Sequence, residues 1–262
     1  MLNLILFHIF LILNAIFIII VFVVGIFLLI RGLQIKMTNI IIASIGFIGL
    51  PIGFIGYFVF NLSEVFQETF VYLAYLSTVI FTNLTFYKKK EREWINYTNI
   101  VLFSVIILGL IQILLLYIQI YLGIYVYYFR VALDFLYTFL TFFWLAWAAF
   151  QSYQRLKEYK IAPWIKLRYR LLWIFSLIIS FNNVPEFFQP PGVQWGTSNN
   201  LISLIVFGTT AILGVIFAIG FLLAWIMPNW LKVKVKGDYT PSQDIQYSEE
   251  ELMRLIKEQL NN

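Results

Sequence analysis

Cysteine is absent from the chain, and histidine occurs once, as His8. Without thiols there can be no disulfide, no thiol nucleophile, no iron–sulfur cluster and no cysteine-type zinc site. A single imidazole cannot supply the paired axial ligands of a b-type haem, or the several histidines of a copper or di-iron centre. We therefore expect this protein to hold no metal and no cofactor.

Charged side chains are also scarce, at 12% of the 262 residues, whereas hydrophobic side chains make up 61%. A chain of this composition cannot shield its apolar surface from water as a soluble domain, because too few polar residues are available to cover it. We therefore predict an all-α integral membrane protein, with the lipid bilayer as its surroundings and no room for a soluble catalytic domain.

Long apolar runs predict a bundle of seven transmembrane helices. The first run is too long for a secretory signal and lacks a basic start. The expected spans are residues 2–30, 37–60, 69–87, 99–121, 124–153, 167–182 and 201–227. We assign residues 1–230 to the seven-helix domain and residues 231–262 to a cytoplasmic linker and a short amphipathic helix.

Basic residues occupy every second gap between these runs. All but one of the 18 Lys and Arg residues fall in four clusters or in the tail, at residues 31–36, 88–92, 155–170, 232–236 and 254–257. Cytoplasmic loops keep Lys and Arg whereas translocated loops shed them, so the alternation predicts an N-terminus outside and a C-terminus in the cytoplasm. The net charge of +5 then reflects topology and contact with anionic lipid, and nucleic acid is not an expected partner.

Arg130 is the exceptional basic residue, because it lies inside the fifth predicted span, with Asp134 four residues later. This spacing puts both side chains on one helix face, which Tyr137 and Thr138 continue inward. A charge within hydrocarbon is costly and is retained when it binds something or joins helices. These four residues therefore indicate either a ligand or ion site in the outer half of the bundle, or a structural ion pair that anchors the helix.

The C-terminal segment predicts one more helix. Ser248 and Glu251 have the spacing of a capping box, in which a hydroxyl and a carboxylate each satisfy a backbone N–H group. A short helix is marginal alone in water, so its apolar face needs a protein partner, the membrane surface or the inner loops of the bundle. The expected partner-binding residues on that face are Leu252, Met253, Ile256 and Leu260.

Seven helices with the N-terminus outside and the C-terminus inside resemble the layout of rhodopsins and of seven-helix sensory receptors, including membrane input modules of prokaryotic signalling proteins. The resemblance is one of topology. Rhodopsins hold retinal on a lysine of the seventh helix, and residues 201–227 contain no lysine, so retinal is not expected. The abundant Ile, Phe, Asn, Lys and Tyr indicate an AT-rich prokaryotic genome, for which we expect a location in the plasma membrane.

These features favour a receptor-like or accessory multi-pass membrane protein, with a polar pocket in its outer half and a tail that docks a cytoplasmic partner. The alternatives are a small-solute transporter or channel that uses Arg130 and Asp134 in a gated path, and a structural subunit of a membrane complex. An enzyme is not expected, because one aspartate and one histidine within the spans form neither a nucleophile–base pair nor a convergent set of carboxylates.

Overall fold

The computed structural model describes residues 2–87, 92–157, 159 and 161–236, and within these ranges the chain forms helices and no strands. The long helices are α1 (Leu2–Gln34), α2 (Thr38–Phe58), α3 (Glu64–Thr82), α4 (Arg92–Tyr121), α5 (Tyr127–Lys157), α6 (Pro163–Ile179) and α7 (Leu201–Ile226). Shorter elements are the π-helical turn η1 (Asn83–Tyr87), the 3-10 turn η2 (Val184–Phe188) and α8 (Asn229–Lys236). Seven helices are long and apolar enough to cross a membrane, which confirms the predicted all-α class and helix number.

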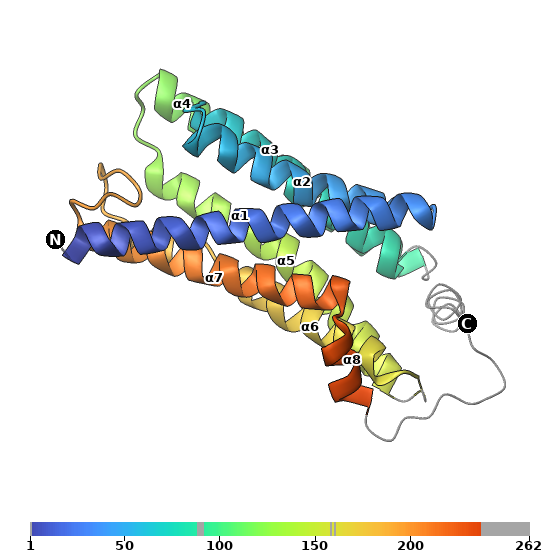
Figure 1. The fold of residues 1–262 in the computed structure, drawn as a ribbon. Coiled ribbons are helices and arrows are strands. Elements are labelled where there is room, and N and C mark those ends of the chain that lie inside the picture. Colours follow the sequence, from blue (N-terminus) through green and yellow to red (C-terminus); the bar gives the residue numbers. More distant parts are fainter. Residues whose placement is uncertain (1, 88–91, 158, 160, 237–262) are drawn as a thin grey trace.

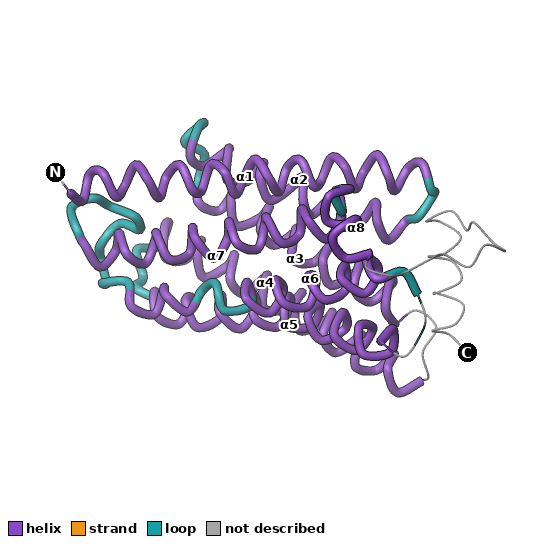
Figure 2. Tube along the Cα trace, turned by 60° about the horizontal axis from the view of Figure 1, so that its bottom comes forward, coloured by secondary structure: helices purple, strands orange, loops and turns teal. Residues whose placement is uncertain are grey.

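The long helices lie side by side and alternate in direction (Figures 1 and 2). Each packs on the next along the chain from α1 to α7, and α7 packs back on α1, which closes the bundle into a ring. α3 also contacts α5 directly. The N-terminus lies at one end of the bundle, the N-terminal end, together with the loop between α4 and α5 and the loop that precedes α7 (Figure 1). The turn after α1 and the helix α8 lie at the opposite end.

Glycines allow α2 to pack closely on both of its neighbours. A Cβ atom added to Gly25 of α1 would lie 2.8 Å from Ile48 Cγ1, and one added to Gly46 of α2 would lie 2.9 Å from the backbone oxygen of Ala74 in α3. Small residues of this kind bring membrane helices together where apolar burial supplies no attraction, because lipid tails are equally apolar. α2 therefore crosses both of its neighbours closely, and it continues as a helix through Pro51.

α3 begins at Glu64, ahead of residue 69, where the predicted third span begins. The reason is a local cap. Ser63 has an extended backbone, and its hydroxyl accepts a hydrogen bond from the backbone N–H of Phe66 at 3.2 Å. As a result Glu64 and Glu68 are fixed on a helix and not carried by a loop.

The connection between α5 and α6 is also more helical than the expected basic loop. α5 continues to Lys157 and α6 begins at Pro163. The cause is a small apolar cluster at this end of the bundle, in which buried side chains from both helices meet. Its buried members are Leu156, Ala162, Ile165 and Tyr169.

Arg168, which the sequence places in the basic cluster 155–170, is buried within α6. Its Nε donates a hydrogen bond to the backbone oxygen of Ala224 in α7 at 3.0 Å. The usual intrahelical partner of that oxygen would be the N–H of residue 228, but residue 228 is proline and has no N–H. Arg168 therefore supplies the hydrogen-bond donor that α7 lacks for the Ala224 carbonyl group, and this bond links α6 to α7.

The close approach of α2 to α3 leads to the first prediction. We expect Gly46→Ala to lower the free energy of unfolding by about 1–3 kcal/mol, because the added methyl group meets the backbone oxygen of Ala74. Gly49→Ala on the same helix is the matched control, since its Cβ would lie 3.6 Å from the nearest atom, Phe70 Cδ1. Thermal unfolding in detergent, followed by tryptophan fluorescence, measures both variants. Equal unfolding midpoints would contradict the close-contact explanation.

Candidate functional site

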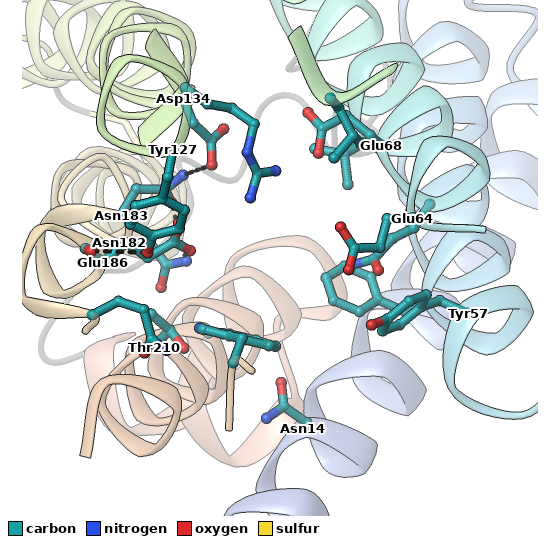
Figure 3. A pocket seen from close by; sticks show the side chains of 18 of the residues that line it. Asn14, Tyr57, Glu64, Glu68, Tyr127, Asp134, Asn182, Asn183, Glu186 and Thr210 are labelled. Atoms are coloured by element: carbon teal, nitrogen blue, oxygen red, sulfur yellow. Dashed lines mark hydrogen bonds between the residues drawn. The ribbon is translucent and has the colours of Figure 1, made fainter. Parts of the chain in front are cut away.

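A cavity of about 590 Å³ opens at the N-terminal end of the bundle (Figure 3). Every long helix from α1 to α7 contributes to its lining. On α5 the lining extends from Tyr127 to Phe142, which is about 22 Å along a helix axis. The cavity therefore reaches from the end of the bundle to its middle, and its volume is typical of a small-molecule site.

The floor of the cavity is apolar and packed. Phe142 of α5 and Phe217 of α7 line it, and their ring centroids lie 5.4 Å apart in an edge-to-face contact. Directly behind them, toward the opposite end, Phe221 packs against Phe217 with centroids 4.4 Å apart and the two rings tilted by 41°. Leu145 and Ala149, the next residues on this side of α5, are fully buried. In the described part of the chain the cavity is thus closed below this layer.

Acidic side chains gather around the cavity. Glu64 and Glu68 come from α3, Asp134 from α5 and Glu186 from η2, and these are all the Asp and Glu residues whose side chains the structure describes. Figure 3 shows the two glutamates of α3 on one wall, and Asp134 with Glu186 on the opposite wall. Among the described residues of the lining, Arg130 is the single basic one, so four carboxylates face one guanidinium group.

Asp134 receives its hydrogen bond from an amide. The Nδ2 atom of Asn183, a buried residue at the start of η2, donates to Asp134 Oδ2 at 2.6 Å. Arg130 lies one turn away on α5, and its buried Nε has no hydrogen-bond partner in the described part of the chain. Both predicted charges thus line the cavity, as a ligand site requires. The alternative of a structural ion pair stays a prediction.

Tyr137 and Thr138, the other two predicted site residues, lie behind the cavity wall. Both are fully buried. The ring of Tyr137 packs against Tyr75 of α3 with centroids 4.7 Å apart, and Thr138 Oγ1 donates a hydrogen bond to the hydroxyl of Tyr75 at 3.3 Å. Tyr75 itself lines the cavity. The structure therefore brings all four predicted residues to one region, where two face the cavity and two support a tyrosine that does.

The predicted partner-binding residues Leu252, Met253, Ile256 and Leu260 lie outside the described residues. The same holds for the capping box before them. Their role stays a prediction, which the truncation experiment below tests.

Several polar atoms of the cavity wall have no hydrogen-bond partner among the described residues. The acceptors are Glu68 Oε1, Gln119 Oε1, Asn182 Oδ1 and Gln189 Oε1, and the donors are Arg130 Nε and Trp195 Nε1. Buried polar atoms in proteins are almost always hydrogen-bonded to protein or to water. A group of acceptors that face one cavity without partners therefore indicates a place where water or a ligand supplies the donors.

Ser203 of α7 fixes the loop that covers part of the cavity mouth. Its Oγ accepts hydrogen bonds from Gln189 Nε2 and from the backbone N–H of Gly196, each at 3.0 Å. The same hydroxyl donates to the backbone oxygen of Gln194 at 2.9 Å. The backbone N–H of Ser203 is in turn bonded to Asn200 Oδ1, which caps α7. One buried hydroxyl thus holds three separate points of the loop.

Sequence reasoning did not identify Glu68, Asn183 and Glu186 as site residues. The available signal was that the gaps at residues 61–68 and 183–200 contain acids and no base. That signal indicated the outer side of the membrane. It did not show that residues about 50 and 120 positions apart along the chain share one cavity, which depends on the packing of α3, α5 and α6.

The carboxylates of the cavity are not arranged as a metal centre. In the part of the chain that the structure describes, no three or more His, Cys, Asp or Glu side chains come together as a group that could hold a metal ion. The carboxylates instead lie on opposite walls (Figure 3). Such a spread suits a molecule that extends between the walls better than a single compact ion.

Comparison of the chain with protein-family models, with curated proteins and with solved structures gives no match. The cavity and the distribution of charge are therefore the observations on which a function rests.

The contacts of Ser203 lead to a second prediction. We expect Ser203→Ala to lower the free energy of unfolding by about 2 kcal/mol or more, because it leaves a buried amide, a backbone N–H and a backbone oxygen without this partner. It also frees the loop, so proteolysis within residues 189–200 becomes faster. Thr209→Val is the control, since the Thr209 hydroxyl bonds only the backbone oxygen of Ile205 in its own helix. Limited proteolysis and thermal unfolding that fail to separate the two variants would contradict this role.

Proposed function

We propose that the protein is a receptor-like membrane protein, which takes a small solute into the cavity and signals its presence to a cytoplasmic partner at the opposite end of the bundle. The cavity is the observation that carries this proposal. All seven long helices line it, so an occupant can contact several of them at once. A solute that binds one arrangement of these helices better than another shifts the bundle toward that arrangement.

The distribution of charge supports a cavity that opens outside the cytoplasm. In the described part of the chain, all Lys and Arg residues except Arg130 belong to the opposite end of the bundle, whereas every Asp and Glu whose side chain is described lines the cavity. Basic residues are retained on the cytoplasmic side of membrane proteins. We therefore place α8 and the α5–α6 connection in the cytoplasm, with the plasma membrane as the proposed location.

The closed floor favours a receptor over a channel. Phe142 and Phe217 end the cavity, and Phe221 lies buried behind them. A channel would need a path through this layer, whereas a receptor needs only a binding site and helices that can change their arrangement.

A transporter that opens alternately to each side remains the second candidate, because the cavity reaches the middle of the bundle, the depth at which transporters bind their solutes. A structural subunit is the third.

The proposed orientation can be tested directly, because the chain contains no cysteine that would compete with an introduced one. We expect Asn199→Cys, in an exposed loop of the N-terminal end, to react with a membrane-impermeant maleimide in intact cells. Gln34→Cys, also exposed but at the end of α1, should react only after permeabilisation. The reverse pattern would place the cavity mouth in the cytoplasm.

The proposed partner can be tested by in-cell crosslinking and affinity purification, with bound proteins identified by mass spectrometry. We expect a partner that associates with the full chain to be lost when the protein is truncated after Lys236. Ile256→Glu should have the same effect, because it puts a charge on the apolar face of the predicted helix. Lys257→Ala is the matched control and should retain the partner.

Association that is unchanged by the truncation would refute the docking role of the tail. The transporter candidate would then take precedence, with solute flux in reconstituted vesicles as the measurement. In that assay Asp134→Asn should alter the flux, because Asp134 lines the cavity from its wall.

A further inference from the structure

We infer that the occupant of the cavity is an organic amine, with its ammonium group held among the carboxylates and its apolar part on the aromatic floor. The inference rests on the proposed function, because it assumes that a solute enters the cavity, and it adds the chemical class of that solute. Three independent features carry it, namely the charge of the walls, the unpartnered acceptors and the chemistry of the floor.

The charge of the walls selects a cation. Four carboxylates line the cavity, and Arg130 can balance one of them. A carboxyl group that is shielded from water keeps its negative charge more readily when a cation lies beside it. A positively charged solute can therefore pair with these groups, whereas an anionic solute cannot. The positions of the carboxylates on opposite walls favour an extended organic cation over a metal ion.

The unpartnered acceptors select a cation that carries N–H groups. Gln189 is 2% exposed, and its Nε2 donates to the backbone oxygen of Val193 and to Ser203 Oγ. Ser203 uses its own hydrogen on Gln194, so it can only accept from Gln189, and this fixes which amide atom of Gln189 is the oxygen. The oxygen that remains, Oε1, lacks a donor among the described residues, as does Glu68 Oε1.

Both oxygens belong to residues that line the cavity. A protonated primary amine can donate up to three hydrogen bonds to such acceptors, whereas a quaternary ammonium ion can donate none. The walls therefore favour a primary or secondary amine over a quaternary one of the same charge.

The floor selects a molecule with an apolar part. Tyr75 and Phe142 lie 5.2 Å apart between ring centroids, in an edge-to-face contact, and Phe142 meets Phe217 in the same way. These three rings come from α3, α5 and α7, and Phe17 of α1 and Ile179 of α6 extend the surface. A small inorganic cation or an unsubstituted ammonium ion would leave this surface unused. An alkylamine or arylalkylamine can use both the floor and the walls, and the cavity of about 590 Å³ can hold it.

The test is a binding measurement on the full-length protein in detergent at low salt, by calorimetry and by thermal shift. The amine probes are 2-phenylethylamine and hexylamine. The comparison probes are the trimethylammonium analogue of 2-phenylethylamine and the anion 3-phenylpropionate. We expect at least one amine to bind and to raise the unfolding temperature. The trimethylammonium analogue should bind at least tenfold more weakly than its parent amine, and 3-phenylpropionate should not bind.

Two variants check that binding occurs at this site. Glu68→Gln should weaken amine binding at least tenfold, because it removes a carboxyl group that can pair with the ammonium group. Thr69→Val, at the neighbouring position, is the control and should bind as the parent does, since the Thr69 hydroxyl bonds Val65 of its own helix and does not line the cavity.

The inference is overturned if neither amine binds, if the trimethylammonium analogue or the anion binds as well as the amine, or if Glu68→Gln has no effect. The assay contains no cytoplasmic partner, so its failure is distinct from a failure of the receptor proposal. Binding of 3-phenylpropionate alone would leave the cavity as a solute site and refute only the amine class. Loss of the partner on truncation would support the receptor proposal whatever the probes show.

Discussion

Hydrocarbon solvates neither a charge nor an unpaired backbone group, and the arrangement of this protein follows from that constraint. The described Lys and Arg residues belong to one end of the bundle, with Arg130 as the exception, while Arg130 and the four acidic residues whose side chains are described line a common cavity. Even the buried Arg168 obeys the same requirement, since it bonds a carbonyl group of α7 that proline leaves without its usual partner. Polar groups therefore lie where water, another side chain or the interior of the cavity can provide hydrogen-bond partners.

The walls of the cavity are held by different means. On one side, glycines of α2 allow backbone-to-backbone packing on α3, which fixes the helix that carries Glu64 and Glu68. On the other side, side-chain hydrogen bonds stabilise the wall. Asn183 donates a hydrogen bond to Asp134, and Ser203 is hydrogen-bonded to the loop over the cavity mouth. Close packing gives one rigid wall, while the other wall depends on a few polar contacts, each of which can be exchanged for a contact with a solute.

The number and order of the helices could be predicted because apolar runs and basic clusters are local properties of the chain. The spacing of Arg130 and Asp134 likewise predicted a shared face, and both line the cavity. The early start of α3 was missed, because a single cap at Ser63 outweighs the polar character of the turn that follows it. Asn183 and Glu186 were missed because their partners are distant in sequence. The contact of Tyr137 with Tyr75 could not be predicted, because packing decides which face of a helix meets its neighbours.

The depth of the cavity has an electrical consequence. Its lining spans about 22 Å of α5, a large part of a hydrocarbon core about 30 Å thick. A positive ion that moves from mouth to floor therefore crosses part of the field of an energised membrane, for which a full crossing is worth about 2.3 kcal/mol per charge at 100 mV. In the proposed orientation, with the basic end in the cytoplasm, a negative interior would draw such an ion toward Phe142 and Phe217. Occupancy of the floor by the proposed solute would then depend on the membrane voltage as well as on concentration, so the same amount of solute would give different occupancies in resting and energised cells.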